Sequence, residues 1–330
     1  MSNPRLILNA MTVDVEDYFQ VSAFEAVVSR DRWGEYERRV GANTDRLLAI
    51  FADSGVHATF FVLGWVAERD PALVRRVAAA GHEIASHGYG HRLVYQQTSG
   101  EFREDLKRAK GLLEALIDRP VRGYRAPSFS ITESSLWALD VLIEEGFAWD
   151  ASIFPIRHDR YGVPSAPRHP FWIAYGRGGH RESSSLGSDP PGGPAGAGQA
   201  PLGGLPVAGS AAGTRVGSAL LEIPGSTVRI AGLNLPTSGG GYFRLLPYRW
   251  TEWSIGRVNR VEARPVVFYL HPWEIDPGQP RQRASAISRF RHYRNLDRTE
   301  SRLRRLLRRF SFGTVTEAMV PASGAPEARA

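Results

Sequence analysis

Two histidines stand four residues apart in the segment Ser86-His87-Gly88-Tyr89-Gly90-His91. Side chains four residues apart lie on one face of a helical turn, so both imidazoles could bind the same metal ion. A pair of exposed or hydrogen-bonded core histidines would show the same spacing. Gly88 and Gly90 each disfavour a helical turn by about 1 kcal/mol relative to alanine. We therefore expect an interaction such as a bound cation to hold this turn.

The chain has no cysteine. Disulfides and thiolate metal sites are therefore excluded, and any metal must be bound by His, Asp and Glu side chains. This ligand set suits a catalytic ion that keeps open coordination positions.

Further polar residues follow apolar runs that are typical of buried strands. They are Asp14, Glu16, Asp17, His87, His91, Arg125, Asp150 and His271. In a parallel α/β barrel the carboxyl ends of the strands open on one rim, where active sites are built. Buried charges are costly unless they are paired or bound to a metal, so packing alone does not explain the set. The simpler alternatives are an ion pair between Arg125 and Asp150 and a core position for His271.

The elements that position these residues alternate between strand and helix. Apolar runs predict strands at residues 6–15, 57–63, 82–87, 122–127, 147–150, 220–224 and 266–270. Helical spacing, caps and terminal glycines predict helices at residues 42–54, 71–81, 101–117 and 132–146. Regular alternation of this kind is typical of βαβ units with parallel strands. The predicted fold class is α/β.

One segment interrupts the pattern. Residues 176–219 contain 13 Gly and 5 Pro among 44 residues, too few large apolar groups to offset the entropy of ordering. We interpret it as a disordered insertion within a single domain that spans residues 1–310. Residues 311–330 are expected to form a partly disordered tail.

The net charge of +7 is concentrated in one region. Residues 281–309 hold 11 Arg against Asp297 and Glu300, a net of +9, so the rest of the chain sums to −2. The body of the protein is therefore not a nucleic-acid surface. The arginine-rich helix predicted at residues 284–310 is either a solvated cover of the barrel or an interfacial helix that contacts anionic lipid or lipid-linked glycan.

The N-terminal apolar run is short, and no apolar stretch approaches the ~18 residues that span a bilayer. We expect a cytoplasmic protein, integral to no membrane, that is either free or peripheral at the inner membrane. The sequence does not predict an oligomeric state.

Five segments resemble, in order, the motifs of the NodB-type polysaccharide deacetylases (carbohydrate esterase family 4). They are TVDVEDYFQV, SHGYGH, RGYRAPSFS, WDASIFP and FYLHPWEID. Their sequences are most similar to those of the exopolysaccharide-locus (XrtA/PEP-CTERM-associated) subgroup. The resemblance covers roughly residues 8–175 and 219–310. It implies a distorted (β/α)7 barrel and a divalent metal held by two His and one carboxylate. The metal is expected to be Zn²⁺, with Co²⁺ or another divalent ion as alternatives.

The resemblance assigns His87 and His91 as metal ligands and Asp14 as the catalytic base. The third ligand is left open, because the usual pair of adjacent Asp residues is replaced here by Asp14-Val15-Glu16-Asp17. Glu16 shares a strand face with Asp14. Asp17 could reach the ion instead if the strand has already turned at Val15.

The resemblance also implies roles for residues of the later motifs. Arg125 would orient and polarise Asp14, and Asp150 would be the acid of the fourth motif and a partner that keeps His271 charged. His271 would be the general acid, and backbone N–H groups near Phe129 would bind the oxyanion.

The function implied is metal-dependent removal of N-acetyl groups from amino sugars of an exopolysaccharide or its precursor. The partner would be an N-acetylated glycan. One alternative is a metal-dependent amidohydrolase of a small amide or cyclic imide. Another is a non-catalytic glycan-binding component of polysaccharide secretion, which would predict the loss of Asp14 or His271.

Overall fold

The structure is a computed structural model that describes residues 7–175, 219–237 and 239–321. Its main sheet has nine strands in the order β10-β1-β2-β3-β4-β5-β7-β6, and β11 also pairs with β1. Neighbouring strands from β10 to β7 run parallel, and β6 is antiparallel to β7. The strands are β1 (Leu8–Val15), β2 (Thr59–Val62), β3 (Glu83–Ser86), β4 (Gly123–Tyr124), β5 (Trp149–Asp150), β6 (Phe171–Ala174), β7 (Ala219–Glu222), β8 (Thr227–Ile230), β9 (Leu233–Pro236), β10 (Val267–Leu270) and β11 (Ser311–Gly313).

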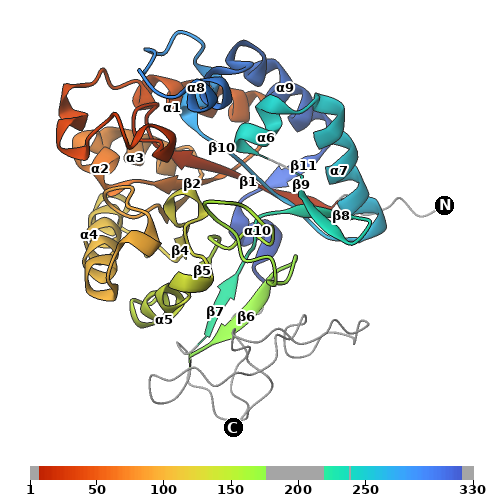
Figure 1. The fold of residues 1–330 in the computed structure, drawn as a ribbon, viewed down its shortest axis with the longest axis horizontal. Helices are drawn as coiled ribbons and strands as arrows, with labels where there is room; N and C mark the ends of the chain where they lie inside the picture. Colours follow the sequence, from red (N-terminus) through yellow and green to blue (C-terminus); the bar gives the residue numbers. More distant parts are fainter. Residues whose placement is uncertain (1–6, 176–218, 238, 322–330) are drawn as a thin grey trace.

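Helices surround this sheet and follow most of its strands (Figure 1). The α-helices are α1 (Val40–Ser54), α2 (Gly64–Arg69), α3 (Pro71–Ala79), α4 (Ser99–Ile117), α5 (Trp137–Glu144), α6 (Gly240–Leu245), α7 (Tyr248–Val261), α8 (Ala286–Tyr293), α9 (Leu296–Arg309) and α10 (Val315–Met319). The 3-10 helices are η1 (Ser22–Phe24), η2 (Arg30–Glu35), η3 (Val94–Gln96), η4 (Pro127–Phe129), η5 (Glu133–Ser135) and η6 (Pro272–Ile275). No helix of the described residues is both long and apolar enough to cross a bilayer.

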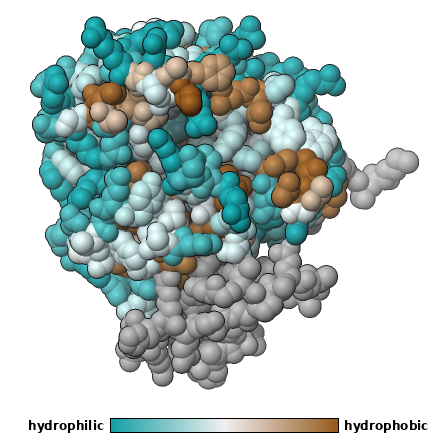
Figure 2. Space-filling view, viewed as in Figure 1, coloured by the Kyte–Doolittle hydropathy of each residue, from teal (hydrophilic) through white to brown (hydrophobic). Residues whose placement is uncertain are grey.

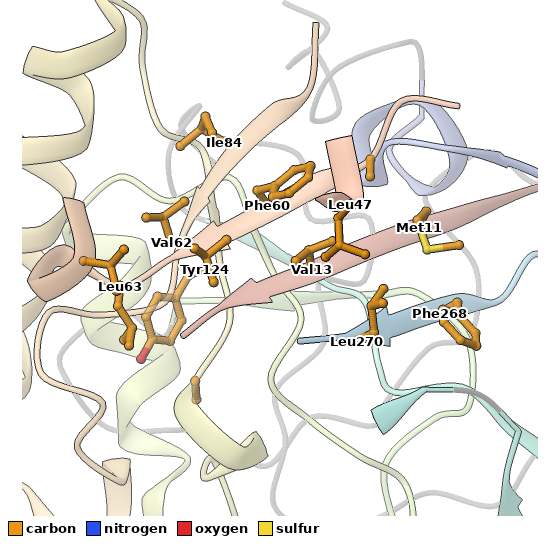
Figure 3. Packing of buried hydrophobic residues seen from close by; sticks show 14 of the residues in the cluster. Met11, Val13, Leu47, Phe60, Val62, Leu63, Ile84, Tyr124, Phe268 and Leu270 are labelled. Atoms are coloured by element: carbon orange, nitrogen blue, oxygen red, sulfur yellow. The ribbon is translucent and has the colours of Figure 1, made fainter. Parts of the chain in front are cut away.

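The central strands of the main sheet bury both of their faces, and alternation along each of these strands separates two cores. Met11 and Val13 of β1 pack outward in a large cluster with Phe60 and Val62 of β2, beneath helices such as α1 (Figure 3). The intervening positions point into the barrel, where Ala10 and Phe61 join residues from β3, β5, β7 and β10 in a second cluster. Thr12 and Asp14 lie on the same inward face as Ala10, because side chains alternate with a period of two.

The barrel is not closed by a continuous ladder, since the strand order begins at β10 and ends at the antiparallel edge strand β6. Ser226, just after β7, accepts a hydrogen bond from the backbone N–H of Val267 at 2.7 Å and so bridges the gap to β10. Seven parallel strands with an open seam confirm the expected distorted (β/α)7 barrel.

Two expectations about the C-terminal part are corrected. The arginine-rich segment is not one helix, because Asn295 adopts a left-handed conformation (φ 57°) and separates α8 from α9. The barrel does not end at residue 310 either. β11 pairs with β1 and α10 packs against it, so residues up to 319 belong to the folded domain. The expected disordered insertion and the end of the tail fall on residues 176–218 and 322–330, outside the described residues.

Candidate active site

The loop that follows β3 carries His87 and His91. It is not the helical turn that the spacing predicts: Gly88 and His91 both have positive φ angles, 72° and 49°. Asp105 of α4 holds the loop by accepting the backbone N–H groups of Tyr89 and Gly90, at 2.7 and 3.1 Å. A side chain at position 88 would collide with Asp105, since an added Cβ would lie 2.7 Å from its Oδ2.

The structure brings His87 and His91 together with Glu16, and one possible ligand atom of each lies within 4.8 Å of the others. All three side chains are buried. His87 Nδ1 lies 2.8 Å from the carbonyl oxygen of Arg125. Because a carbonyl only accepts, Nδ1 carries the proton and Nε2 keeps a lone pair for a ligand. Burial lowers the pKa of His87 to about 4, so its imidazole is neutral at pH 7.

Glu16 has the properties of the third ligand. Its Oε2 lies 2.6 Å from His91 Nε2 but has no aligned hydrogen-bond partner among the described residues. Burial acts to raise the pKa of Glu16, but the nearby charges of His91 and His271 outweigh it and lower the pKa to about 2. A buried, ionised carboxylate beside two imidazoles fits a divalent cation such as Zn²⁺.

Asp17, the alternative ligand, points elsewhere. The chain does turn at Val15, where the N–H of Glu16 bonds to the carbonyl of Asp14 at 3.0 Å. The Asp17 carboxylate nevertheless accepts the N–H groups of Tyr18, Arg39 and Val40 and so caps the N-terminus of α1. Burial raises its pKa to about 6 against the effect of these N–H groups. The structure therefore groups Glu16, and not Asp17, with the histidines.

Replacing Asp17 with asparagine tests this distinction. We expect Asp17→Asn to lower the free energy of unfolding by about 1–3 kcal/mol, because its NH₂ group would face backbone donors in a buried position. Metal content should not change. Denaturant unfolding and metal analysis of the same preparation check both statements. Loss of metal at unchanged stability would restore Asp17 as a ligand.

Arg125 binds and orients the carboxylate of Asp14. Arg125 Nη1 donates to Asp14 Oδ1 at 2.7 Å and to Thr12 Oγ1 at 2.9 Å, while its Nε donates to the carbonyl of Ala151. The guanidinium is 1% exposed and lies over the ring of Phe61. Asp14 Oδ2 is left to face the pocket and His271. This is the arrangement expected for an oriented carboxylate base.

His271 lies opposite Asp14, with its Nε2 3.8 Å from Asp14 Oδ2 and 3.6 Å from Glu16 Oε1. Its Nδ1 lies 2.6 Å from Glu274 Oε1. Burial acts to lower the pKa of His271, but the negative charges of Glu16, Glu274 and Asp14 outweigh it and raise the pKa to about 9. The imidazole is therefore protonated at neutral pH, as a general acid requires.

The expected role of Asp150 beside His271 is wrong. Asp150 is completely buried and accepts a hydrogen bond from Ser152 at 2.5 Å. It stands in register with Glu222 across the β5–β7 ladder. Burial raises the pKa of Asp150 to about 6, and burial beside Asp150 raises that of Glu222 well above its usual value. Arg125 does not pair with Asp150 in the structure, so the simple ion pair between them is not formed either.

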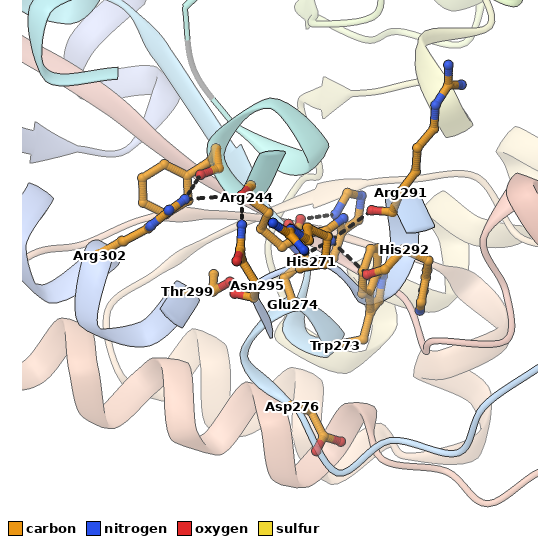
Figure 4. A network of polar contacts seen from close by, with 12 residues as sticks. Arg244, His271, Trp273, Glu274, Asp276, Arg291, His292, Asn295, Thr299 and Arg302 are labelled. Carbon is orange, nitrogen blue, oxygen red and sulfur yellow. Dashed lines mark hydrogen bonds and ion pairs between the residues drawn. The ribbon is translucent and has the colours of Figure 1, made fainter. Parts of the chain in front are cut away.

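Glu274 and the residue that holds it are not among the site residues predicted from the sequence. Arg244 of α6 is 2% exposed and donates from its Nε to Glu274 Oε2 at 2.6 Å, so Arg244, Glu274 and His271 form a buried chain (Figure 4). Trp273 stacks between the rings of His271 and His292 and donates from its Nε1 to Glu16 at 3.3 Å. Glu274 stands three residues after His271 and closes a capping box with it at η6, so this spacing could have indicated the partner.

These groups open on one cavity of about 870 Å³. Asp14, Glu16, His87, His91 and His271 line the cavity together with aromatic side chains: Tyr95, Phe129, Tyr161, Tyr242, Tyr269 and Trp273. Asp17, Arg125 and Asp150 lie outside the lining. Flat aromatic faces around a small polar cluster suit a ring-shaped ligand that carries one reacting group.

Comparison with known families gives two matches along the chain. The model of the family described as polysaccharide deacetylase matches residues 34–142, and a domain of unknown function (DUF3473) matches residues 200–320. A peptidoglycan-N-acetylglucosamine deacetylase of Bacillus cereus is 33% identical over 98 residues, which are 29% of this chain and 36% of the relative. A chitooligosaccharide deacetylase of Sinorhizobium fredii is 33% identical over 115 residues, 33% of this chain and 49% of the relative. The chain thus spans less than half of the length of these relatives.

Solved structures share the fold over nearly the whole chain. A Mycobacterium smegmatis protein described as a polysaccharide deacetylase matches with a TM-score of 0.54 and 19% identity, over 95% of this chain and 88% of the other. The Puue allantoinase matches with a TM-score of 0.52 and 15% identity, over 96% and 93% of the two chains. At these identities the comparison establishes the barrel alone.

Proposed function

We propose that this chain is a member of the NodB-type polysaccharide deacetylases, which its sequence matches resemble, and that it is a hydrolase that removes N-acetyl groups from amino sugars. One observation carries the proposal. A Glu-His-His cluster, a carboxylate held by Arg125 and a histidine held by Glu274 all converge on one aromatic-lined cavity. Hydrolysis of an unactivated amide needs these three functions together: an electrophile, a base and an acid.

The first function is assigned to Glu16, His87 and His91, which would hold a divalent cation. When bound, such an ion would supply Lewis-acid chemistry next to Asp14. Zn²⁺ is the proposed ion, because two imidazoles and one carboxylate are a common zinc ligand set in hydrolases. The neutral state of His87 and the anionic state of Glu16 are the protonation states that such binding needs.

The other two functions are divided between Asp14 and His271. Asp14 Oδ2 takes the proton from the attacking water, while Arg125 keeps Oδ1 occupied and the carboxylate oriented. His271 has its Nδ1 held by Glu274, so its Nε2 proton is directed to the leaving amine of the sugar. The raised pKa of His271, about 9, keeps its imidazole protonated at neutral pH, so that it can act as the acid while Asp14 acts as the base.

The substrate is proposed to be an N-acetylated glycan of an exopolysaccharide or its precursor. The aromatic walls of the cavity support a sugar ring as ligand. Contact with an anionic membrane surface through the arginine-rich C-terminal segment is also proposed, on the basis of its concentrated positive charge.

Acetate release from N-acetylglucosamine oligomers tests the proposal most directly. We expect release by the protein supplied with Zn²⁺, loss after chelation, and recovery when Zn²⁺ is added back. A small acetamide and a cyclic imide are assayed in parallel. Turnover of these two compounds alone would favour a small-molecule amidohydrolase. No turnover of any acetylated glycan or amide would favour a glycan-binding component.

A further inference from the structure

The two helices of the arginine-rich segment differ in how their side chains are used. In α9 the apolar residues Leu303, Leu306 and Leu307 are buried against the barrel. Several α9 arginines form ion pairs with acids of other elements: Arg304 with Asp53, and Arg305 and Arg309 with Glu252. α9 is therefore a cover of the barrel, as the simpler interpretation of the sequence predicts.

Helix α8 presents apolar side chains to solvent. Ile287 is 66% exposed and Phe290 is 58% exposed, although the opposite face of the helix buries His292 against Trp273 and Phe24. The space-filling view shows apolar side chains among polar ones over the region of α8 (Figure 2). Covering such apolar side chains with another surface is favourable, because it removes them from water.

The apolar pair is surrounded by unpaired positive charge. Between Asp276 and Asp297 the sequence has no acid and five arginines: Arg281, Arg283, Arg289, Arg291 and Arg294. All five are exposed, and among the described residues none of them has an ion-pair partner. Three of them, Arg281, Arg289 and Arg294, line a hollow of about 320 Å³ together with Phe290 and Tyr293. The hollow offers several guanidinium groups to an anion, beside an aromatic ring.

We propose that α8 and the preceding residues 281–285 form an interfacial surface that binds anionic phospholipid. Ile287 and Phe290 would insert among the acyl chains near the headgroups, and Arg281, Arg289 and Arg294 would contact lipid phosphates. A phospholipid surface matches both the exposed apolar pair and the unpaired arginines around it. Its acyl chains can cover apolar side chains, and its phosphates lie within one side-chain length of them. A soluble anion would leave the two apolar side chains exposed.

The surface also borders the candidate active site. Arg291 and His292 of α8 line the cavity that contains Asp14 and His271, so docking through α8 would bring the cavity opening to the membrane. This step rests on the proposed function: it identifies the substrate as an N-acetylated sugar presented at a lipid surface, such as a lipid-linked precursor. Membrane binding itself does not depend on the activity.

Vesicle co-sedimentation of the full chain tests the surface. We expect binding to vesicles of mixed phosphatidylglycerol and phosphatidylcholine, little binding to phosphatidylcholine alone, and release at high salt. The double variant Ile287→Ser, Phe290→Ser should bind at least about tenfold more weakly. The triple variant Arg281→Gln, Arg289→Gln, Arg294→Gln should bind the anionic vesicles on the order of a hundredfold more weakly. Each arginine near an anionic surface contributes about 1 kcal/mol to binding.

Matched substitutions outside α8 are the controls. Leu233 of β9 is 65% exposed, so Leu233→Ser makes the same change at similar exposure, and Arg308→Gln removes an exposed charge from α9. Both should bind like the parent. Absence of binding to anionic vesicles, or equal loss in the control variants, would overturn the proposal. All variants should release acetate from soluble oligomers at the parental rate. A parent that binds vesicles but releases no acetate would contradict the proposed function alone.

Discussion

Replacing His271 with alanine is expected to lower kcat for N-acetylglucosamine oligomers by about 10²- to 10⁴-fold and to leave metal content unchanged. Without the protonated imidazole the sugar amine must leave as an anion or take its proton from water. Metal content should persist because Glu16, His87 and His91 remain in place. Steady-state kinetics and metal analysis of the same sample measure both quantities.

His158→Ala is the matched control, because His158 lines the same cavity without contacting Asp14 or Glu16. It should change kcat little. Equal activity of His271→Ala and the parent would remove His271 from the mechanism. Glu274→Gln refines the result, because Glu274 helps to raise the pKa of His271. Removing its charge destabilises the imidazolium, so the pKa of His271 falls and the alkaline limb of the kcat profile moves to lower pH.

The sequence predicts which residues meet, because the barrel fixes where strand ends lie. Asp14 is the penultimate residue of β1, and His87 and His271 directly follow β3 and β10. Parallel strands place these ends on one rim, whatever the details of the connecting helices. The pairing of β1 with β10 and the order β1-β2-β3 then bring the three side chains to one cavity. The main features of the site therefore follow from short-range pattern and fold class.

The finer assignments depend on contacts between distant residues, which local pattern does not encode. Glu16 and Asp17 are adjacent acids, and what separates their roles is the position of α1, whose first N–H groups bind Asp17. Asp150 lies in the barrel interior, in register with Glu222, which is 72 positions later in the sequence. The partner of His271 is instead Glu274, which Arg244 holds from α6. None of these long-range contacts is visible in the hydrophobic pattern of the strands.

The His87–His91 loop illustrates the same limit. Four-residue spacing predicts a helical turn, but the two rings meet with centroids 5.5 Å apart on a loop with two positive φ angles. Asp105, from the following helix, stabilises this shape by binding the loop's backbone N–H groups. The predicted proximity is correct and the predicted conformation is wrong. Positive φ at Gly88 is also the reason that glycine stands there.

Replacing Glu16 with glutamine is expected to weaken Zn²⁺ binding by more than about 100-fold. Loss of a residue that only hydrogen-bonds to a metal ligand weakens binding by about 10- to 100-fold, and Glu16 is expected to bind the ion directly. The amide has no negative charge, and its NH₂ group could donate to His91 Nε2 and occupy that ligand atom. Isothermal titration of the metal-free protein measures the affinity. A second readout is thermal unfolding: Zn²⁺ at 100 times its Kd should stabilise the parent by about 2.7 kcal/mol and the variant hardly at all.

Glu25→Gln is the control for this experiment, since Glu25 lines the same cavity but pairs with Arg30 at 2.8 Å and not with a histidine. It should bind Zn²⁺ like the parent. If Glu16→Gln keeps parental affinity, the cluster of Glu16, His87 and His91 is not the metal site. If Glu16→Gln loses the metal while Asp17→Asn keeps it, the two adjacent acids have separate roles: Glu16 binds the ion, and Asp17 attaches the first helix to the end of the first strand.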